Sequence, residues 1–284
     1  MIPAPFEYAR AGSVDEAMSL LQHHGEDAKL LAGGHSLLPL MKLRLARPSV
    51  VIDIDRLSDL EDIRETADGL EIGALTRIED LARSSTVRSV NGLLAHTAGQ
   101  IGDPQVRHRA TIGGTIAHGD PASDMPTVLL ALDAEFVVRG PGGERTVPAS
   151  GFFTSLFETA LAPDEMLTSV RVRSLGGAGF SYQKFHRRAI DWAIVGVAAV
   201  VERSDGSISG ARVGLTNMGM TPLRASGVEE ALAGADGSAD AIRAAAEHAP
   251  EGTSPVSDTN GSAEYRTELS KVLTRRAVEE ALGR

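Results

Sequence analysis

Two glycine pairs constrain what this chain can fold into more than any other feature of its sequence. Gly33-Gly34 lies between a short apolar run and a helical segment, and Gly113-Gly114 lies in a long polar stretch. Glycine lets backbone N–H groups approach a ligand closely and reach positive φ angles. Successive N–H groups in such a turn form an anion nest, and a helix N-terminus adds partial positive charge. Either pair alone is more often a tight turn between packed elements, but the two together favour a pyrophosphate site.

The motifs around the pairs narrow the kind of site. Neither pair fits the Rossmann pattern G-x-G-x-x-G or the P-loop pattern G-x-x-x-x-G-K-S/T, which disfavours a standard NAD or ATP site. A serine hydrolase built on Gly34-His35-Ser36 would need glycine at position 38, where the chain has leucine. A non-redox nucleotide-binding or assembly module stays open as an alternative.

Composition excludes further classes of protein. A chain of 284 residues favours two domains, and it can bury cores without disulfides or metals. The net charge of −10 argues against nucleic acid as a partner, and the absence of cysteine excludes a cysteine-ligated iron–sulfur cluster in this chain. The N-terminus lacks a signal-peptide pattern, and no apolar run approaches the roughly 20 residues that cross a bilayer. We therefore expect a cytoplasmic protein with no integral membrane span.

Residues 1–175 are predicted to form two α/β subdomains that divide near residue 55. In the first subdomain, Ser13 and Glu16 predict a capping box for a helix that Gly25 ends. In the second, Thr76 and Glu79 predict another capping box. The other expected elements are strands at 29–32, 50–54, 70–74 and 167–172, helices from residue 36 and at 91–101 and 125–132, and a hairpin around 140–143. A long polar, glycine-containing stretch covers residues 102–124.

A glycine-rich segment, residues 174–179, is the best candidate for a linker between domains. Beyond it, strands are expected at 180–185, 193–201 and 211–216, and helices at 228–233, 239–248 and 264–282. Strands followed by helices are typical of a separate α+β domain, which would span residues 180–284.

Several motifs resemble one family, and the resemblance covers essentially the whole chain. The motifs on which the resemblance rests are Ala32-Gly33-Gly34-His35-Ser36-Leu37-Leu38-Pro39, Asp103-Pro104-Gln105-Val106-Arg107, Thr111-Ile112-Gly113-Gly114, Gly119-Asp120-Pro121-Ala122-Ser123-Asp124, Tyr182-Gln183-Lys184-Phe185, Asp191-Trp192-Ala193, Gly214-Leu215-Thr216-Asn217 and Ala263-Glu264-Tyr265-Arg266. These are similar to the flavoprotein subunits of molybdenum hydroxylases, above all those of the carbon monoxide dehydrogenase type. The resemblance implies an α+β fold: an FAD-binding domain of the vanillyl-alcohol-oxidase (PCMH) type, followed by a smaller α+β domain with an antiparallel sheet.

The resemblance also implies which residues contact a noncovalent FAD. Residues 30–37, which we call the first loop, and residues 111–115, which we call the second loop, would enclose the pyrophosphate. Lys184 would reach the isoalloxazine edge, and Trp192 could cover that ring. His118 reads equally as a ligand contact or a loop hydrogen bond. The full set of expected FAD-binding residues is Lys29, Leu30, Leu31, Ala32, Gly33, Gly34, His35, Ser36, Leu37, Ile101, Thr111, Gly113, Gly114, Thr115, His118, Asp120, Ser123, Asp124, Leu167, Lys184 and Trp192. No residue of this chain is expected to act on the substrate or to bind a metal.

The implied function is electron transfer within an oxidoreductase complex. A large subunit would hold the molybdenum cofactor, a small subunit would hold 2Fe–2S clusters, and FAD would pass electrons to a quinone or another acceptor. The resemblance implies a heterohexamer with possible peripheral membrane association. Carbon monoxide is the expected substrate of the molybdenum partner; the alternatives are heterocycles of the nicotine, caffeine or purine type, or aldehydes.

Overall fold

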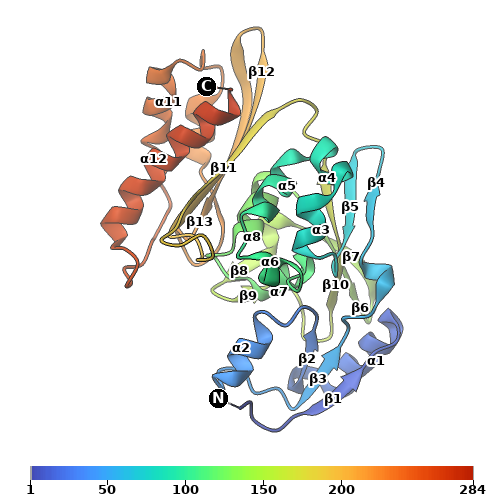
Figure 1. Ribbon diagram of the computed structural model, residues 1–284. Helices are drawn as coiled ribbons and strands as arrows, with labels where there is room; N and C mark the ends of the chain where they lie inside the picture. The colour runs from blue at the N-terminus through green and yellow to red at the C-terminus, as the bar shows by residue number, and fades with distance from the viewer. Residues whose placement is uncertain (1, 284) are drawn as a thin grey trace.

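The first subdomain is built around a small parallel sheet. The computed structural model describes residues 2–283, and its sheet has the order β1 (Glu7–Arg10), β3 (Val50–Asp53), β2 (Ala28–Leu31). Helix α1 (Val14–His24) and the 3-10 turn Gly25–Asp27 precede β2, and α2 (Leu37–Lys42) follows it. This blue unit lies at the bottom of Figure 1.

The ends of α1 follow the predicted signals in part. Ser13 Oγ accepts from the Glu16 N–H, and Gly25 ends the helix with a positive φ of 54°, as predicted. Glu16 Oε2, however, accepts from the Gly12 N–H at 2.7 Å rather than from Ser13. The reciprocal half of the capping box is therefore displaced by one residue.

The second subdomain contains a five-stranded antiparallel sheet. Its strand order is β4 (Ile63–Glu65), β5 (Gly69–Gly73), β10 (Met166–Arg173), β6 (Glu135–Gly140), β7 (Gly143–Pro148). The pairing of β6 with β7 confirms the predicted hairpin. Its helical elements are the 3-10 turn Ser58–Leu60, α3 (Ile78–Arg83), α4 (Ser85–Val90), α5 (Gly92–Gly99), α6 (Pro104–Arg107), α7 (Ile112–His118), α8 (Asp124–Ala131) and α9 (Ala149–Phe152), and β8 (Phe153–Ser155) pairs with β9 (Glu158–Thr159).

One local prediction for this subdomain is wrong, and two helices were not predicted. The polar, glycine-containing stretch 102–124 contains α6 and α7. Thr76 does not cap α3: its hydroxyl donates to the Glu61 carbonyl, and Arg77 occupies the N-cap position. Glu79 instead binds Arg83 and Arg107, and the hydrogen bond from Arg107 is the main cause that lowers the pKa of Glu79. Tertiary partners thus outcompete the local capping pattern.

The C-terminal part is an antiparallel sheet with helices on one face. The strand order is β11 (Gly179–Phe185), β12 (Val195–Ser204), β13 (Ser207–Thr216), β14 (Leu223–Arg224). Helices α10 (Ser226–Leu232), α11 (Ala239–Ala246) and α12 (Ala263–Ala281) follow, as the sequence predicted. They appear in orange and red in Figure 1.

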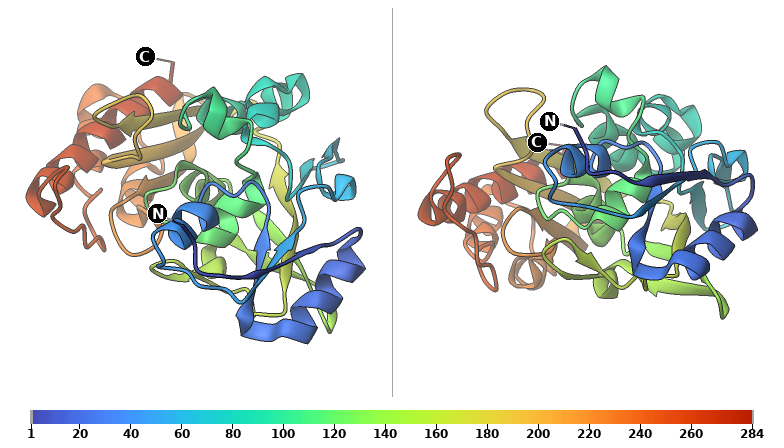
Figure 2. Two further views of the ribbon diagram at one scale, coloured as in Figure 1. Left: turned by 60° about the horizontal axis from the view of Figure 1, so that its bottom comes forward. Right: turned by 90° about the horizontal axis from the view of Figure 1, so that it is seen from below.

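Strand β12 is buried on both faces and joins two cores. Val195, Val197, Ala199 and Val201 pack with the C-terminal helices. Ala198 and Val200 pack instead with the core of the second subdomain, together with Tyr182. Helices α5 and α8 therefore lie between the five-stranded and the four-stranded sheets (Figures 1 and 2).

Glycine makes the contact between α8 and the four-stranded sheet close. A Cβ at Gly214 would lie 2.8 Å from the Thr127 carbonyl oxygen, and a Cβ at Gly196 would lie 2.6 Å from the Tyr182 hydroxyl. A larger residue at Gly214 would push α8 and the sheet apart, and a larger residue at Gly196 would displace the Tyr182 side chain, whose hydroxyl bonds to Asp124 on α8.

Candidate functional site

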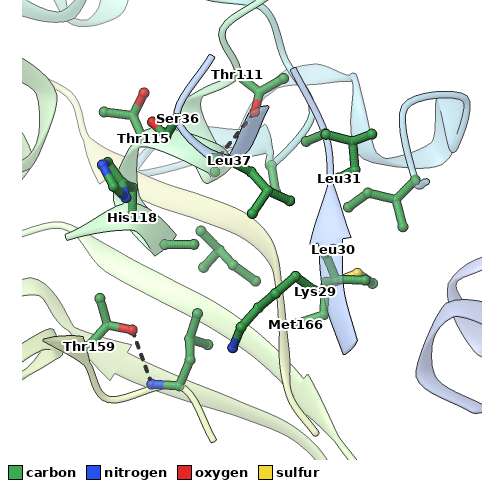
Figure 3. A pocket seen from close by; sticks show the side chains of 18 of the residues that line it. Lys29, Leu30, Leu31, Ser36, Leu37, Thr111, Thr115, His118, Thr159 and Met166 are labelled. Carbon is green, nitrogen blue, oxygen red and sulfur yellow. Dashed lines mark hydrogen bonds between the residues drawn. The ribbon is translucent and has the colours of Figure 1, made fainter. Parts of the chain in front are cut away.

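A cavity of about 630 Å³ lies between the first and second subdomains. This volume is in the range of cofactor and ligand pockets. β2, the first glycine loop and α2 form one side, and the second glycine loop, the β8–β9 hairpin and the segment 161–167 form the other. Figure 3 shows Leu30 and Leu31 facing His118 and Thr159 across it.

Fifteen of the residues predicted from the sequence line this one cavity. They are Lys29, Leu30, Leu31, Ala32, Gly33, Gly34, His35, Ser36, Leu37, Thr111, Gly113, Gly114, Thr115, His118 and Leu167. The two glycine loops, about 80 residues apart in sequence, thus face a common space, which is the geometry that a bound pyrophosphate requires.

The first loop carries a run of backbone donors. Its N–H groups from Gly33 to Leu37 have no hydrogen-bond acceptor within residues 2–283. Gly34 has a positive φ of 78°, and a Cβ at Gly33 would lie 1.9 Å from the Arg109 carbonyl oxygen. Gly33 therefore lets the first loop touch the backbone that leads into the second loop, and Gly34 turns the chain into α2.

The second loop is the first turn of α7. Thr111 Oγ1 accepts from the Gly114 N–H at 3.1 Å and caps this helix. Gly113 is buried, and a Cβ there would lie 2.6 Å from Ala74. Gly114 is exposed to the cavity, and a Cβ would meet only the Thr111 hydroxyl. The two glycines thus differ in role: Gly113 permits packing, whereas Gly114 leaves space beside the cavity.

The wall opposite β2 was missed by the sequence analysis. It includes Thr154, Phe157, Glu158, Thr159, Leu161, Ala162, Pro163, Glu165 and Met166. Arg145 holds this wall, because it forms a two-point ion pair with Glu165 (2.7 and 2.6 Å) and donates to the Ala160 carbonyl. Glu165 also accepts from the Ala162 N–H. No residue type or spacing in the sequence marks these contacts.

His118 and Phe157 form an aromatic pair on the cavity wall. Their ring centroids are 5.1 Å apart, and Phe157 has a positive φ of 58°. Burial lowers the pKa of His118, against a smaller opposing effect of Asp120. At neutral pH, His118 therefore presents a neutral ring to the cavity.

The other six predicted residues lie outside the cavity lining. They are Ile101, Asp120, Ser123, Asp124, Lys184 and Trp192. Asp120 accepts from the Ala122 N–H, Ser123 precedes α8, Ile101 packs at the edge of the core, and Trp192 is largely exposed. Their contacts with a cofactor stay predictions.

Asp124 and Lys184 form a buried ion pair between α8 and β11. Lys184 Nζ lies 2.8 Å from Asp124 Oδ2, and the side chains are 2% and 5% exposed. The Tyr182 hydroxyl donates to Asp124 Oδ1 at 2.6 Å and contacts Thr216 Oγ1 at 3.2 Å. Burial raises the pKa of Asp124, although Lys184 opposes this, and burial followed by the Asp124 charge raises the pKa of Tyr182 well above its usual value.

The fold and the cavity define a class of protein: a two-subdomain cofactor-binding unit with an additional α+β domain. The residues present fit FAD, because backbone N–H groups without an acceptor in the first loop face a glycine-lined helix start across a partly apolar cavity. Within residues 2–283, no three acidic or histidine side chains are grouped to hold a metal ion, and no helix is long and apolar enough to cross a membrane.

Comparisons with known proteins agree with this class. Residues 4–173 match the family described as FAD binding domain in molybdopterin dehydrogenase, and residues 180–281 match the carbon monoxide dehydrogenase flavoprotein C-terminal domain. The medium chain of carbon monoxide dehydrogenase from Hydrogenophaga pseudoflava is 45% identical over 100% of this chain and 99% of its own length. Subunit alpha of the 6-hydroxypseudooxynicotine dehydrogenase complex of Paenarthrobacter nicotinovorans is 39% identical over 100% of this chain and 97% of its own length. A solved structure of the Hydrogenophaga pseudoflava carbon monoxide dehydrogenase superposes with a TM-score of 0.98 at 46% identity, covering 100% of this chain and 99% of that chain.

The chain belongs to the family of FAD-binding medium subunits of molybdopterin-dependent dehydrogenases, of the carbon monoxide dehydrogenase type. The expectations of an α+β fold, an FAD cofactor and an oxidoreductase subunit are therefore confirmed. Its relatives are the medium chain of carbon monoxide dehydrogenase and a subunit of a dehydrogenase complex, so this chain is a medium-chain subunit of a multi-subunit complex.

Proposed function

We propose that this chain binds one FAD noncovalently across the cavity, with both glycine loops at the pyrophosphate. The observation that carries this proposal is the run of N–H groups from Gly33 to Leu37, which have no acceptor within residues 2–283 and lie at the cavity wall. Backbone donors at such a turn stabilise phosphate oxygens without a lysine or arginine at each one. We further propose domains of 1–175, with subdomains of about 1–55 and 56–175, and 180–284.

The fifteen cavity residues would contact FAD directly, and the six outside it would act from its edge. Lys29 to Leu37 would follow the cofactor along β2 and the first loop, and Thr111 to Thr115 would face it from α7. Asp124 and Lys184 would lie toward the flavin end, with Lys184 oriented by its ion pair. Ile101, Leu167 and Trp192 would supply apolar contacts, and Asp120 and Ser123 would hold the turn before α8.

The bound flavin would accept electrons from 2Fe–2S clusters of a small partner subunit and release them to a quinone or another acceptor. This chain binds and orients the cofactor and excludes water from its pyrophosphate. A large molybdenum subunit would oxidise carbon monoxide, in a heterohexamer located in the cytoplasm with possible peripheral association with the membrane. The 45% identity to a carbon monoxide dehydrogenase medium chain supports this substrate.

A second candidate keeps the flavin role and changes the substrate of the molybdenum partner. The 39% identity to a subunit of a 6-hydroxypseudooxynicotine dehydrogenase complex supports a heterocycle in place of carbon monoxide, and the 38% identity to a glyceraldehyde dehydrogenase medium chain supports an aldehyde. This chain would do the same work in either complex, because the substrate meets only the molybdenum subunit.

The test of cofactor binding is acid precipitation of the purified protein. FAD should appear in the supernatant in a ratio of about one per chain. Flavin that stays in the pellet would refute noncovalent binding, and a colourless protein indifferent to added FAD would refute the site. Stopped-flow bleaching of the flavin in the assembled complex, by carbon monoxide or by an N-heterocycle, then decides between the two substrate classes.

A further inference from the structure

The segment that ends α2 carries exposed leucines. Leu45 is 74% and Ile2 is 79% exposed, and Leu38 and Leu43 are also exposed. Arg44 Nε donates to the Ile2 carbonyl, so the N-terminal residues lie against this segment, and α2 lies beside the N-terminus in Figures 1 and 2. We call Ile2, Leu38, Leu43 and Leu45 the α2 patch. Clustered exposed apolar side chains indicate an interaction surface.

The backbone that presents the patch is strained. Helix α2 ends in a Schellman motif, in which the Leu45 N–H donates to the Leu40 carbonyl at 2.9 Å and the Arg44 N–H to the Met41 carbonyl at 3.0 Å. The left-handed position of this motif favours glycine, but Arg44 occupies it with φ 60°. The apolar side chain after that position usually folds back on the helix, whereas Leu45 points to solvent. A strained residue that holds an apolar side chain outward suggests a function outside the fold of this chain.

The charges around the patch indicate its partner. Lys42, Arg44 and Arg47 are exposed and form no ion pair within residues 2–283, although the whole chain carries a net charge of −10. An apolar centre with unpaired cations around it is complementary to a protein face with an apolar centre and an acidic rim. Three unpaired cations would also make the association fast and salt-dependent.

The position of the patch indicates which partner approaches. The same segment contributes Leu37, Leu40 and Ala46 to the cavity lining, so the patch lies at the rim of the cofactor cavity. Electrons reach a flavin only from a donor that comes close to it. Resting on the proposed FAD function, we infer that the α2 patch is the docking surface for the iron–sulfur subunit, which meets it with an acidic rim.

The first test introduces charge into the patch. Leu43→Glu/Leu45→Glu in the full chain should weaken association with the molybdenum and iron–sulfur subunits at least tenfold without changing the melting temperature. Val256→Glu is the matched control, because Val256 is 68% exposed on the C-terminal domain and should bind normally. An unchanged affinity of the double variant would overturn the proposal.

Arg44→Gly separates docking from a structural role. Glycine relieves the left-handed strain, so the melting temperature should rise while association weakens and loses part of its salt dependence. A residue that serves only the fold would change the melting temperature and leave association alone, and that result would count against the proposal.

Carbodiimide cross-linking of the assembled complex identifies the occupant. This reagent joins lysine to a carboxylate in direct contact, so Lys42 should be linked to an acidic residue of the iron–sulfur subunit. Linkage only to the molybdenum subunit or to a second copy of this chain would refute the assignment. The assignment would also fail if the α2 patch bound anionic phospholipid vesicles and its variants still assembled normally with the other subunits. Flavin content is measured separately from subunit association. Absence of FAD would therefore refute the proposed function, while the association measurements would still test the docking surface.

Discussion

Replacing Lys184 with methionine should destabilise the chain strongly, because it leaves Asp124 buried without its cation. At a separation of 2.8 Å and an effective dielectric constant of about 20, two unit charges attract by about 6 kcal/mol. Removing one partner of a buried pair costs about 3–5 kcal/mol once the surroundings relax. We expect a loss in this range in the free energy of unfolding at pH 8.

The loss should depend on pH with a definite sign. Burial already raises the pKa of Asp124, and Lys184 is the main opposing influence, so the variant's Asp124 should titrate still higher. A carboxyl whose pKa is higher in the folded state binds its proton there first, so folding gains stability as the pH falls toward the unfolded pKa near 3.8. The deficit of Lys184→Met should therefore shrink between pH 8 and pH 5.

Urea denaturation of the apo-protein, followed by circular dichroism across this pH range, measures both effects. The double variant Lys184→Met/Asp124→Asn removes both charges and keeps the acceptor for Tyr182, so it should recover most of the loss. A single-variant loss under about 1 kcal/mol, typical of exposed ion pairs, would refute the reasoning, and so would a loss that is equal at pH 5 and pH 8.

Gly114→Val should weaken FAD binding far more than it lowers the melting temperature of the apo-protein. Gly113→Val should lower both the FAD affinity and the melting temperature, because Gly113 packs on Ala74, and equal losses in the two variants would make both glycines structural. Tyr182→Phe should cost about 1–3 kcal/mol, since it removes a buried hydrogen bond to a charged group, and urea denaturation would show no change if that bond were absent. The isolated holo-protein should show no flavin reduction by carbon monoxide in a stopped-flow experiment, because it has no cysteine to hold a cluster; turnover by the lone chain would overturn the electron-transfer role.

Local signals in the sequence predict the elements that local chemistry determines. Ser13 and Gly25 bound α1 where expected, and the turn at residues 140–143 joins two paired strands. Nothing in the local pattern indicates a helix at the second glycine pair, because each glycine costs a helix about 1 kcal/mol. It is helical nonetheless, since Thr111 caps α7 and Gly113 packs closely on Ala74.

Contacts between distant residues account for what the sequence could not predict. The Arg145–Glu165 pair holds the cavity wall, and the Asp124–Lys184 pair joins residues 60 positions apart. Neither spacing carries a periodic signal, because these partners meet only when sheets and helices pack. The resemblance of short motifs predicted fifteen residues that line one cavity in the structure. It did not predict the residues of the opposite wall.

The two-sided burial of β12 has a consequence for how this chain can be divided. The glycine-rich segment at 174–179 looks like a natural place to cut, yet Tyr182, Ala198 and Val200 beyond it complete the core that contains α5 and α8. A chain ending at residue 175 would expose that core to water, and a chain beginning at 180 would expose one whole face of its sheet. A flexible connection in the sequence therefore need not mark a thermodynamic boundary, and we expect the second subdomain and the C-terminal domain to unfold as one cooperative unit.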